Sequence, residues 1–248
     1  RQPTFAPAAV TDVQGKKLWH DQRIARASGA SDIDLAAASD TDTDLRLRDW
    51  SLKREAILAA PLAKPGVNVG EGPRSRYRAR AAGNDFQLDL QCTETQSWLL
   101  QGDEGLSRKG PETAQASYYY SLPQMAVSGQ ITLQGQQFQL DTAAPHAAWL
   151  DHEWSQSLLP PQAVGWDWIG MNLQDGSALT AFRLRDATGG AVWDGGSFRP
   201  PTRGAPARAF APGRVVFDPL LSLHRPPTQA RSPVALPAPR PAPVLPRP

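Results

Sequence analysis

Apolar and polar residues alternate along most of the chain between Leu45 and Phe198. In one clear example, Phe86, Leu88 and Leu90 are each separated by a single polar residue. Gly, Pro, Asn or Asp interrupts this pattern about every 8 to 15 residues. Period-two alternation places one side of an extended segment against a core and the other in solvent. Many short strands with turns at this spacing predict an all-β, antiparallel barrel or sandwich.

Four segments, most of them outside Leu45–Phe198, lack this alternation. Lys17–Ala27 and Asp151–Leu159 are short and amphipathic, and they are the two candidate helices. Ser31–Asp44 is polar and predicts a solvated loop. Its Asp-Thr-Asp-Thr-Asp run lacks the Gly and the distal Glu of a compact calcium loop, so no metal site is expected. Thr202–Pro248 is rich in Pro and Arg, a composition that predicts a disordered or polyproline-like tail.

Charge and composition exclude several classes of protein. The net charge of +2 divides into +7 from Arg199 onward and −5 before it, and no basic stripe carries interleaved aromatic residues, which argues against a nucleic acid partner. The sequence contains no run of 18 apolar residues, the length that a membrane-spanning helix needs. The single cysteine, Cys92, excludes an intrachain disulfide and is expected to be a small buried side chain.

Motifs for other chemistries are missing from the sequence. No Gly-x-Ser-x-Gly turn follows a plausible strand, and the four His residues are scattered without metal-ligand spacing. No glycine-rich phosphate loop occurs. We therefore expect neither a metal nor a nucleotide or other cofactor.

Four longer strings are more specific than composition. They are QGDEGLSRKG (101–110), ASYYYSLPQMAVSG (116–129), AWLDHEWSQSLL (148–159) and GWDWIGMNLQDGSALTAFRLRD (165–186). In this order and spacing the chain resembles the carotenoid 1,2-hydratase (hydroxyneurosporene synthase) family and its AttH-like relatives, which are often labelled secreted hydrolases. The resemblance spans roughly residues 5 to 199.

This resemblance implies two lipocalin-like barrels in tandem around a hydrophobic cleft, in a bacterial protein that is periplasmic or secreted. The expected organisation is part of an N-terminal barrel over 1–130, the start of a second barrel over 131–200, and the tail over 201–248. The tandem barrel is expected to be incomplete, because the usual upstream Glu-Trp-Trp-Tyr string and the closing downstream strands are not seen.

Hydration of an isolated carbon–carbon double bond needs an acid, a cation-tolerant wall and a water molecule. A carboxyl group buried against aromatic rings can stay protonated and act as the acid, and Asp151, Glu153 and Asp167 all have Trp neighbours in sequence. Aromatic faces can stabilise a carbocation by about 1–2 kcal/mol each. His152 could orient the water. The His-x-Trp string carries the resemblance onto His152 and Trp154 as pocket residues.

Strand parity restricts the choice of site residues. In an extended 148–154 segment, His152 and Trp154 share one face, opposite Asp151 and Glu153. Asp167 is our first choice of acid and Asp151 our second. The predicted site comprises Asp167, His152 and Asp151 for catalysis, and Trp154, Trp166, Trp168, Tyr119 and Trp149 for substrate binding.

Other interpretations of these residues stay open. The Trp side chains could be barrel core, Asp151 could belong to a turn or helix cap, and the SRKG string could be an exposed charged turn. At the level of function, the alternative to a hydratase is a periplasmic carrier of a lipid or apolar small molecule linked to an ABC-type export system. A degraded product without function is a third reading. A carboxyl group pointing into the lumen would favour the enzyme over the carrier.

Overall fold

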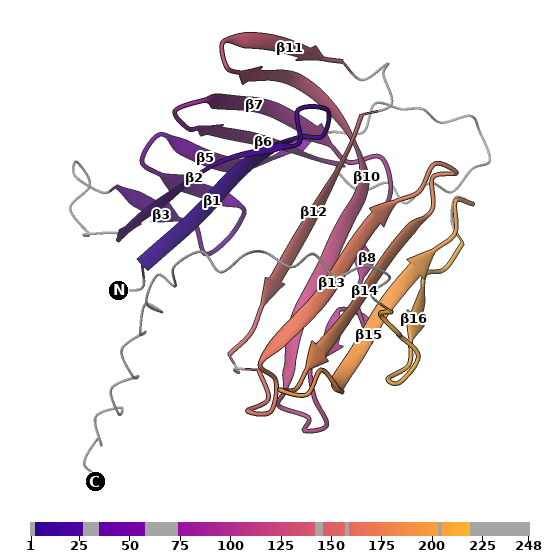
Figure 1. Ribbon diagram of the computed structural model, residues 1–248. Helices are drawn as coiled ribbons and strands as arrows, with labels where there is room; N and C mark the ends of the chain where they lie inside the picture. The colour runs from indigo at the N-terminus through magenta and orange to yellow at the C-terminus, as the bar shows by residue number, and fades with distance from the viewer. Residues whose placement is uncertain are drawn as a thin grey trace, which may run out of the picture. The chain divides into compact units, whose positions relative to one another are not determined.

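The computed structural model describes residues 3–26, 35–57, 74–141, 146–156, 159–202 and 205–218. Within these ranges every regular element is a strand, which confirms the all-β prediction (Figure 1). The described part of the chain contains no helix long and apolar enough to cross a membrane. The strands are β1 Pro3–Asp12, β2 Lys17–Arg26, β3 Ala36–Ala38, β4 Asp44–Leu47, β5 Trp50–Ile57, β6 Arg74–Ala82, β7 Phe86–Thr93, β8 Leu99–Leu100, β9 Leu106–Arg108, β10 Ala116–Leu133, β11 Gln136–Leu140, β12 Ala147–Trp154, β13 Gly165–Asn172, β14 Ala178–Arg185, β15 Ala191–Arg199 and β16 Arg208–Phe210.

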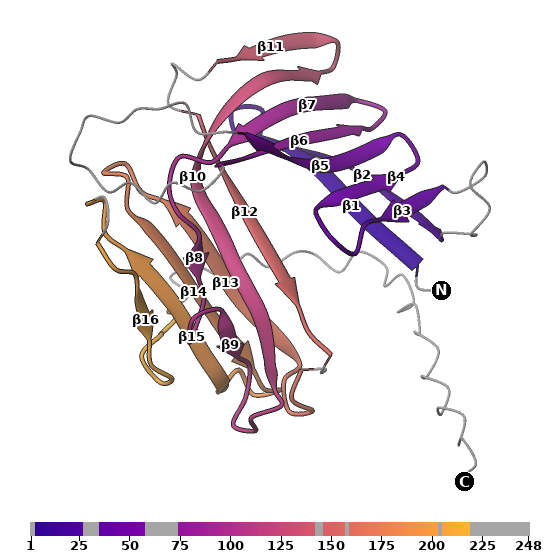
Figure 2. The ribbon, with the colours of Figure 1, turned by 180° about the vertical axis from the view of Figure 1, so that it is seen from behind.

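The strands form three antiparallel sheets. β1 and β2 pair as a hairpin, and β13, β14, β15 and β16 pair in chain order. The third sheet has ten strands. Seven of them follow the path β11-β10-β7-β6-β5-β4-β3, and the other three, β8, β9 and β12, pair with β10. Figure 2 shows this curled ten-stranded sheet from behind, with β10 extending through it.

The long strand β10 changes partners near its middle. Its first part pairs with β8, β9 and β12, and its second part pairs with β7 and β11. The register with β12 shifts between Leu122 and Met125, where Pro123 has no N–H to donate and Gln124 adopts a positive φ of 56°. The Gln124 N–H donates to Asn172 Oδ1 at 2.7 Å, which ties this irregularity to the end of β13.

Two of the predicted domains, 1–130 and the tail over 201–248, can be compared with the strands. The boundary expected at residue 130 lies inside β10, and the division into two barrel parts stays a prediction. β16 lies within the segment expected to be a tail, because Arg208–Phe210 pairs with Gly196–Phe198 of β15. Residues 203–204 and 219–248 of that segment lie outside the described residues.

Both helix predictions are wrong. Lys17–Arg26 is strand β2, paired residue for residue with β1, and its half-buried positions alternate from Trp19 to Ala25. In the second predicted helix, Asp151–Leu159, residues 151–154 are the end of β12, and residues 157–158 lie outside the described residues. A ten-residue amphipathic segment fits either period, and pairing with a neighbouring strand satisfies its backbone groups just as well as a helix.

The predicted loop at Ser31–Asp44 is only partly correct. Residues 31–34 lie outside the described residues, Ala36–Ala38 forms β3, and Asp44 begins β4. Asp42, in the middle of the acidic run, accepts hydrogen bonds from Arg54 Nε at 2.6 Å and Nη2 at 2.8 Å. This carboxylate is therefore engaged by a neighbouring strand.

A small core lies where β6, β10 and β12 meet. Tyr77, Leu122 and Met125 are fully buried, and the half-buried side chains packed on them include Cys92 and Leu150. Burial raises the pKa of the Cys92 thiol. This core fixes β12 against the first part of β10, and these two strands carry most of the candidate site.

Candidate functional site

The pairing of β10 with β12 sorts the candidate residues onto two faces. Tyr119 lies opposite Glu153 and Ser121 opposite Asp151, whereas Tyr120 lies opposite His152 and Tyr118 opposite Trp154. Directly opposed residues point to the same side of an antiparallel pair. We call the two sides the Tyr119 face and the Tyr120 face.

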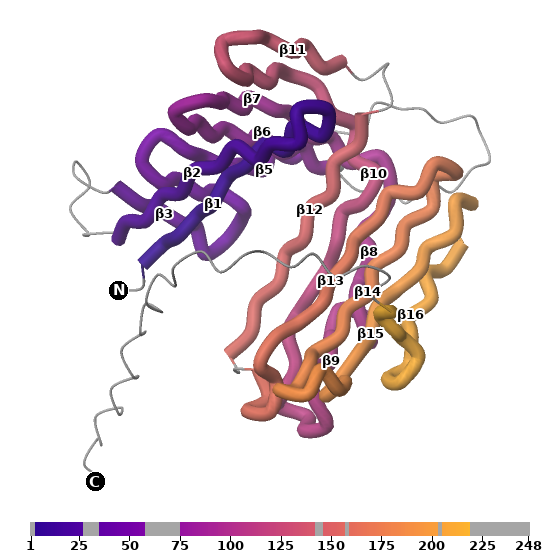
Figure 3. Tube along the Cα trace, in the orientation of Figure 1, coloured from indigo at the N-terminus to yellow at the C-terminus, as the bar shows by residue number. Residues whose placement is uncertain are grey.

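β13 and β14 supply an aromatic wall. Trp166 pairs with Leu184 and Trp168 with Phe182, so these four side chains share one side of the four-stranded sheet. The Trp168 Nε1–H donates to the Tyr119 hydroxyl at 3.2 Å, which joins this wall to the Tyr119 face. In the tube of Figure 3, β13 follows β12 and the two strands lie side by side, and the Asn172 amide donates to the Ala148 carbonyl at 3.2 Å.

A cavity of about 470 Å³ opens between the Tyr119 face and this wall. Its volume is typical of a small-molecule site. The lining residues are mostly apolar, with a few polar groups, and comprise Lys109, Ala116, Ser117, Tyr119, Glu153, Trp154, Ser155, Leu159, Trp166, Trp168, Phe182 and Leu184.

An ion pair is the main polar feature of the lining. Lys109 Nζ lies 2.8 Å from Glu153 Oε1, and the same oxygen accepts a hydrogen bond from Ser117 Oγ at 2.5 Å. The Lys109 side chain is only 14% exposed, whereas that of Glu153 is 39% exposed. The ammonium group also lies 5.0 Å from the ring centre of Tyr119 and 4.4 Å from that of Phe182.

Tyr119 and Asp151 extend the polar groups of this face beyond the ion pair. The Asp151 carboxylate accepts hydrogen bonds from Ser121 Oγ at 2.6 Å and from Trp149 Nε1 at 2.8 Å. Burial and the nearby Asp151 raise the pKa of Tyr119. Its hydroxyl therefore stays neutral and can donate a hydrogen bond at the cavity wall.

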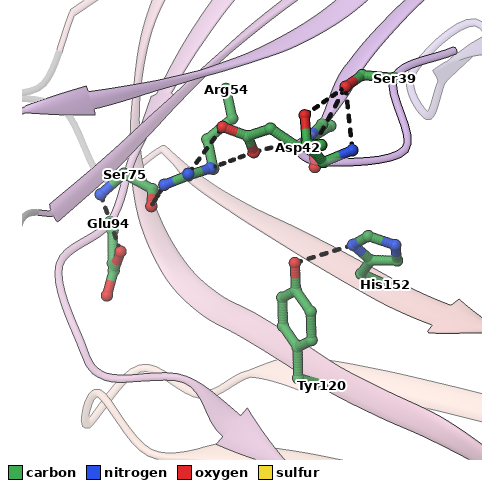
Figure 4. Close-up of polar contacts among 9 residues, drawn as sticks. Ser39, Asp42, Arg54, Ser75, Glu94, Tyr120 and His152 are labelled. Atoms are coloured by element: carbon green, nitrogen blue, oxygen red, sulfur yellow. Dashed lines mark hydrogen bonds and ion pairs between the residues drawn. The ribbon is translucent and has the colours of Figure 1, made fainter.

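His152 lies on the Tyr120 face, outside the cavity lining. In Figure 4 it lies beside Tyr120, whose hydroxyl is 2.9 Å from His152 Nδ1. The same view shows Asp42, from the turn before β4, and Arg54, from β5. The Tyr120 ring stacks on Trp98 at 4.6 Å. Successive residues of a strand point to opposite faces, so His152 and Glu153 lie on opposite sides of β12 although they are neighbours in sequence.

Asp167 lies on the side of the four-stranded sheet opposite Trp166 and Trp168. Its Oδ2 accepts hydrogen bonds from Arg183 Nε at 2.9 Å and Nη2 at 2.7 Å, and its Oδ1 accepts one from Arg185 Nε at 3.1 Å. The catalytic role expected of Asp167 stays a prediction, and this geometry engages both of its oxygens with guanidinium groups.

Most of the expected binding residues converge. Trp154, Trp166, Trp168 and Tyr119 all line the cavity, and Trp149 contacts Asp151 next to it. Lys109 is not among the residues that the sequence predicts for the site. The expectation that the SRKG string is an exposed turn is wrong for the Lys109 side chain, which is only 14% exposed. Glu153 lies outside the predicted catalytic set, although the alternation along 148–154 puts it on the same face as Asp151, and this is the signal that points to it.

Comparisons with known proteins agree with this architecture. One similar protein is known from a crystal structure, an AttH, provisionally identified as such, from Nitrosomonas europaea. The match has 39% sequence identity and a TM-score of 0.74, and it covers 90% of this chain and 61% of the Nitrosomonas chain. Kievitone hydratase from Nectria haematococca shares the fold at 14% identity and a TM-score of 0.60, over 84% of this chain and 55% of its own. The chain thus spans less than two thirds of either protein, and no curated protein matches it. The AttH-like family model matches residues 1–240, and the chain therefore belongs to the AttH-like family.

Proposed function

We propose that the chain carries a hydratase site, which adds water to an isoprenoid-type carbon–carbon double bond in the cavity between β10, β12, β13 and β14. The observation that carries this proposal is a carboxyl group, Glu153, in the lining of a largely apolar cavity whose wall carries Trp166 and Trp168. A lining without an acid would suit a carrier, whereas an acid within the lumen suits proton transfer to carbon.

Glu153 is the proton donor in this proposal, and the steps balance. The Glu153 O–H bond breaks and its proton adds to the less substituted alkene carbon, which leaves a tertiary carbocation and a Glu153 carboxylate. Water then forms the new C–O bond, and its surplus proton returns to Glu153. The π faces of Trp166 and Trp168 stabilise the cation by about 1–2 kcal/mol each when desolvated.

The Tyr119 and Ser117 hydroxyls are placed to orient the water. Ser117 Oγ already donates to Glu153, and Tyr119 lies opposite Glu153 in the strand register. Water captured beside the carboxylate then loses its proton over a single hydrogen bond. The hydratase named among the fold neighbours supports this class of reaction. An acyclic carotenoid as substrate, a periplasmic or secreted location and a link to an export system stay predictions.

Turnover in ¹⁸O-labelled water tests the proposal. The wild-type chain should incorporate one labelled oxygen into an isoprenoid alkene, offered both as citronellol and as citronellic acid, detected by mass spectrometry. Glu153→Gln should abolish incorporation, because the amide cannot supply the proton. Glu112→Gln, the same change at an exposed position, is the control and should retain it. Apolar ligand bound without any turnover by the wild type would refute the hydratase and favour the carrier.

A further inference from the structure

The ion pair in the cavity is unexpected for a site that takes a pure hydrocarbon. Removing two charges from water costs free energy that a neutral ligand does not return. Lys109 is held within the lining by its contacts with Glu153, with Ser107 Oγ at 3.1 Å and with the rings of Tyr119 and Phe182. A cation kept at an apolar wall is suited to an anionic group on the ligand.

Charge and volume limit what that group can be. Lys109 is the one cationic side chain among the described residues that line the cavity, so a single negative charge can be matched but a diphosphate cannot. At the roughly 30 Å³ that a liquid water molecule occupies, the cavity of about 470 Å³ holds about 15 non-hydrogen atoms. This is the size of a short isoprenoid with one small head group.

We infer that the substrate is an apolar, unsaturated monocarboxylic acid whose carboxylate takes the place of Glu153 on Lys109. This inference rests on the proposed function, since it identifies the substrate of the same site. The ligand binds as the carboxylate that it is at pH 7, and this carboxylate pairs with the Lys109 ammonium. One proton taken up from solvent forms the O–H bond of the displaced Glu153 carboxyl group, so charge and protons balance.

In this exchange Glu153 gains its proton when the substrate binds. The bound carboxylate takes Lys109 away from Glu153, within a site from which the apolar chain excludes water. The other titratable groups on this face are Tyr119 and Asp151, and Asp151 is engaged by Ser121 and Trp149. Glu153 is therefore the group on which the proton arrives.

Paired ligands test the head group. Binding of citronellic acid and of citronellol, which differ only in carboxylate against alcohol, is measured by calorimetry at pH 7. The wild type should prefer the acid by about tenfold or more, because one partly buried charge pair is worth at least that much. Lys109→Met should lose this preference and keep its affinity for the alcohol. Lys53→Met, at an exposed lysine paired with Asp44, is the matched control and should behave as wild type.

Proton linkage gives a second, independent readout. Calorimetry in phosphate and in Tris should report uptake of about one proton per citronellic acid bound by the wild type, and none by Glu153→Gln. Equal affinity for acid and alcohol, or unchanged preference in a folded Lys109→Met, would overturn the inference. Selective acid binding with proton uptake but no ¹⁸O incorporation would refute only the hydratase, and hydration of citronellol without acid preference would refute only the head-group assignment.

Discussion

Replacement of Asp167 by Asn separates a structural role of this carboxylate from a catalytic one. Asp167 binds Arg183 and Arg185, and the three side chains are 29%, 18% and 35% exposed. An exposed ion pair contributes about 0–1 kcal/mol, and breaking a buried one costs about 3–5 kcal/mol. With this intermediate exposure, and with one neutral acceptor oxygen kept by Asn, we expect the free energy of unfolding to fall by about 1–2 kcal/mol.

Urea denaturation and turnover of the same preparation measure the two roles. The unfolding midpoint of Asp167→Asn should fall while turnover in ¹⁸O-labelled water stays within about threefold of wild type, since Asp167 lies across the sheet from the cavity. Asp89→Asn is the matched control, because Asp89 also accepts from two arginines, Arg78 and Arg80. A folded Asp167→Asn that loses turnover while Asp89→Asn retains it would make Asp167 the acid and refute our choice of Glu153.

Three further predictions concern stability. Leu122→Ala, at a fully buried position, should lower the free energy of unfolding by about 2–5 kcal/mol in urea denaturation. Gly129→Ala should lower it by about 2 kcal/mol or more, because Gly129 has a φ of 122° and an added Cβ would overlap the Asp89 carbonyl oxygen. Arg54 holds the pKa of Asp42 below its usual value of 3.8, so this carboxylate adds stability above pH 3.8 that is lost as pH falls through the depressed pKa. The difference in stability between wild type and Asp42→Asn should therefore be constant at neutral pH and vanish in acid, as measured by denaturation at a series of pH values.

The strand pattern was predictable where apolar and polar residues alternate in the sequence. Phe86–Thr93 and Ala178–Arg185 form β7 and β14 as their sequences indicate. Lys17–Arg26 was not predictable in the same way, because its ten residues satisfy a helical and an extended period equally, and only the complete pairing with β1 decides between them. Lys109 was missed because burial of a charged residue after a short strand depends on β14 and β12, which lie far along the chain.

The site itself depends on register, which the sequence does not state. Parity along 147–154 tells which residues share a face, but the pairing of Tyr119 with Glu153 decides that the Glu153 side, and not the His152 side, meets the wall of Trp166 and Trp168. A shift of one residue would exchange the two faces and bring His152 to the cavity. The bend at Pro123 and Gln124, fixed by the hydrogen bond to Asn172, resists such a shift. The contact that joins β10 to β13 therefore also selects Glu153 rather than His152 for the cavity side of β12.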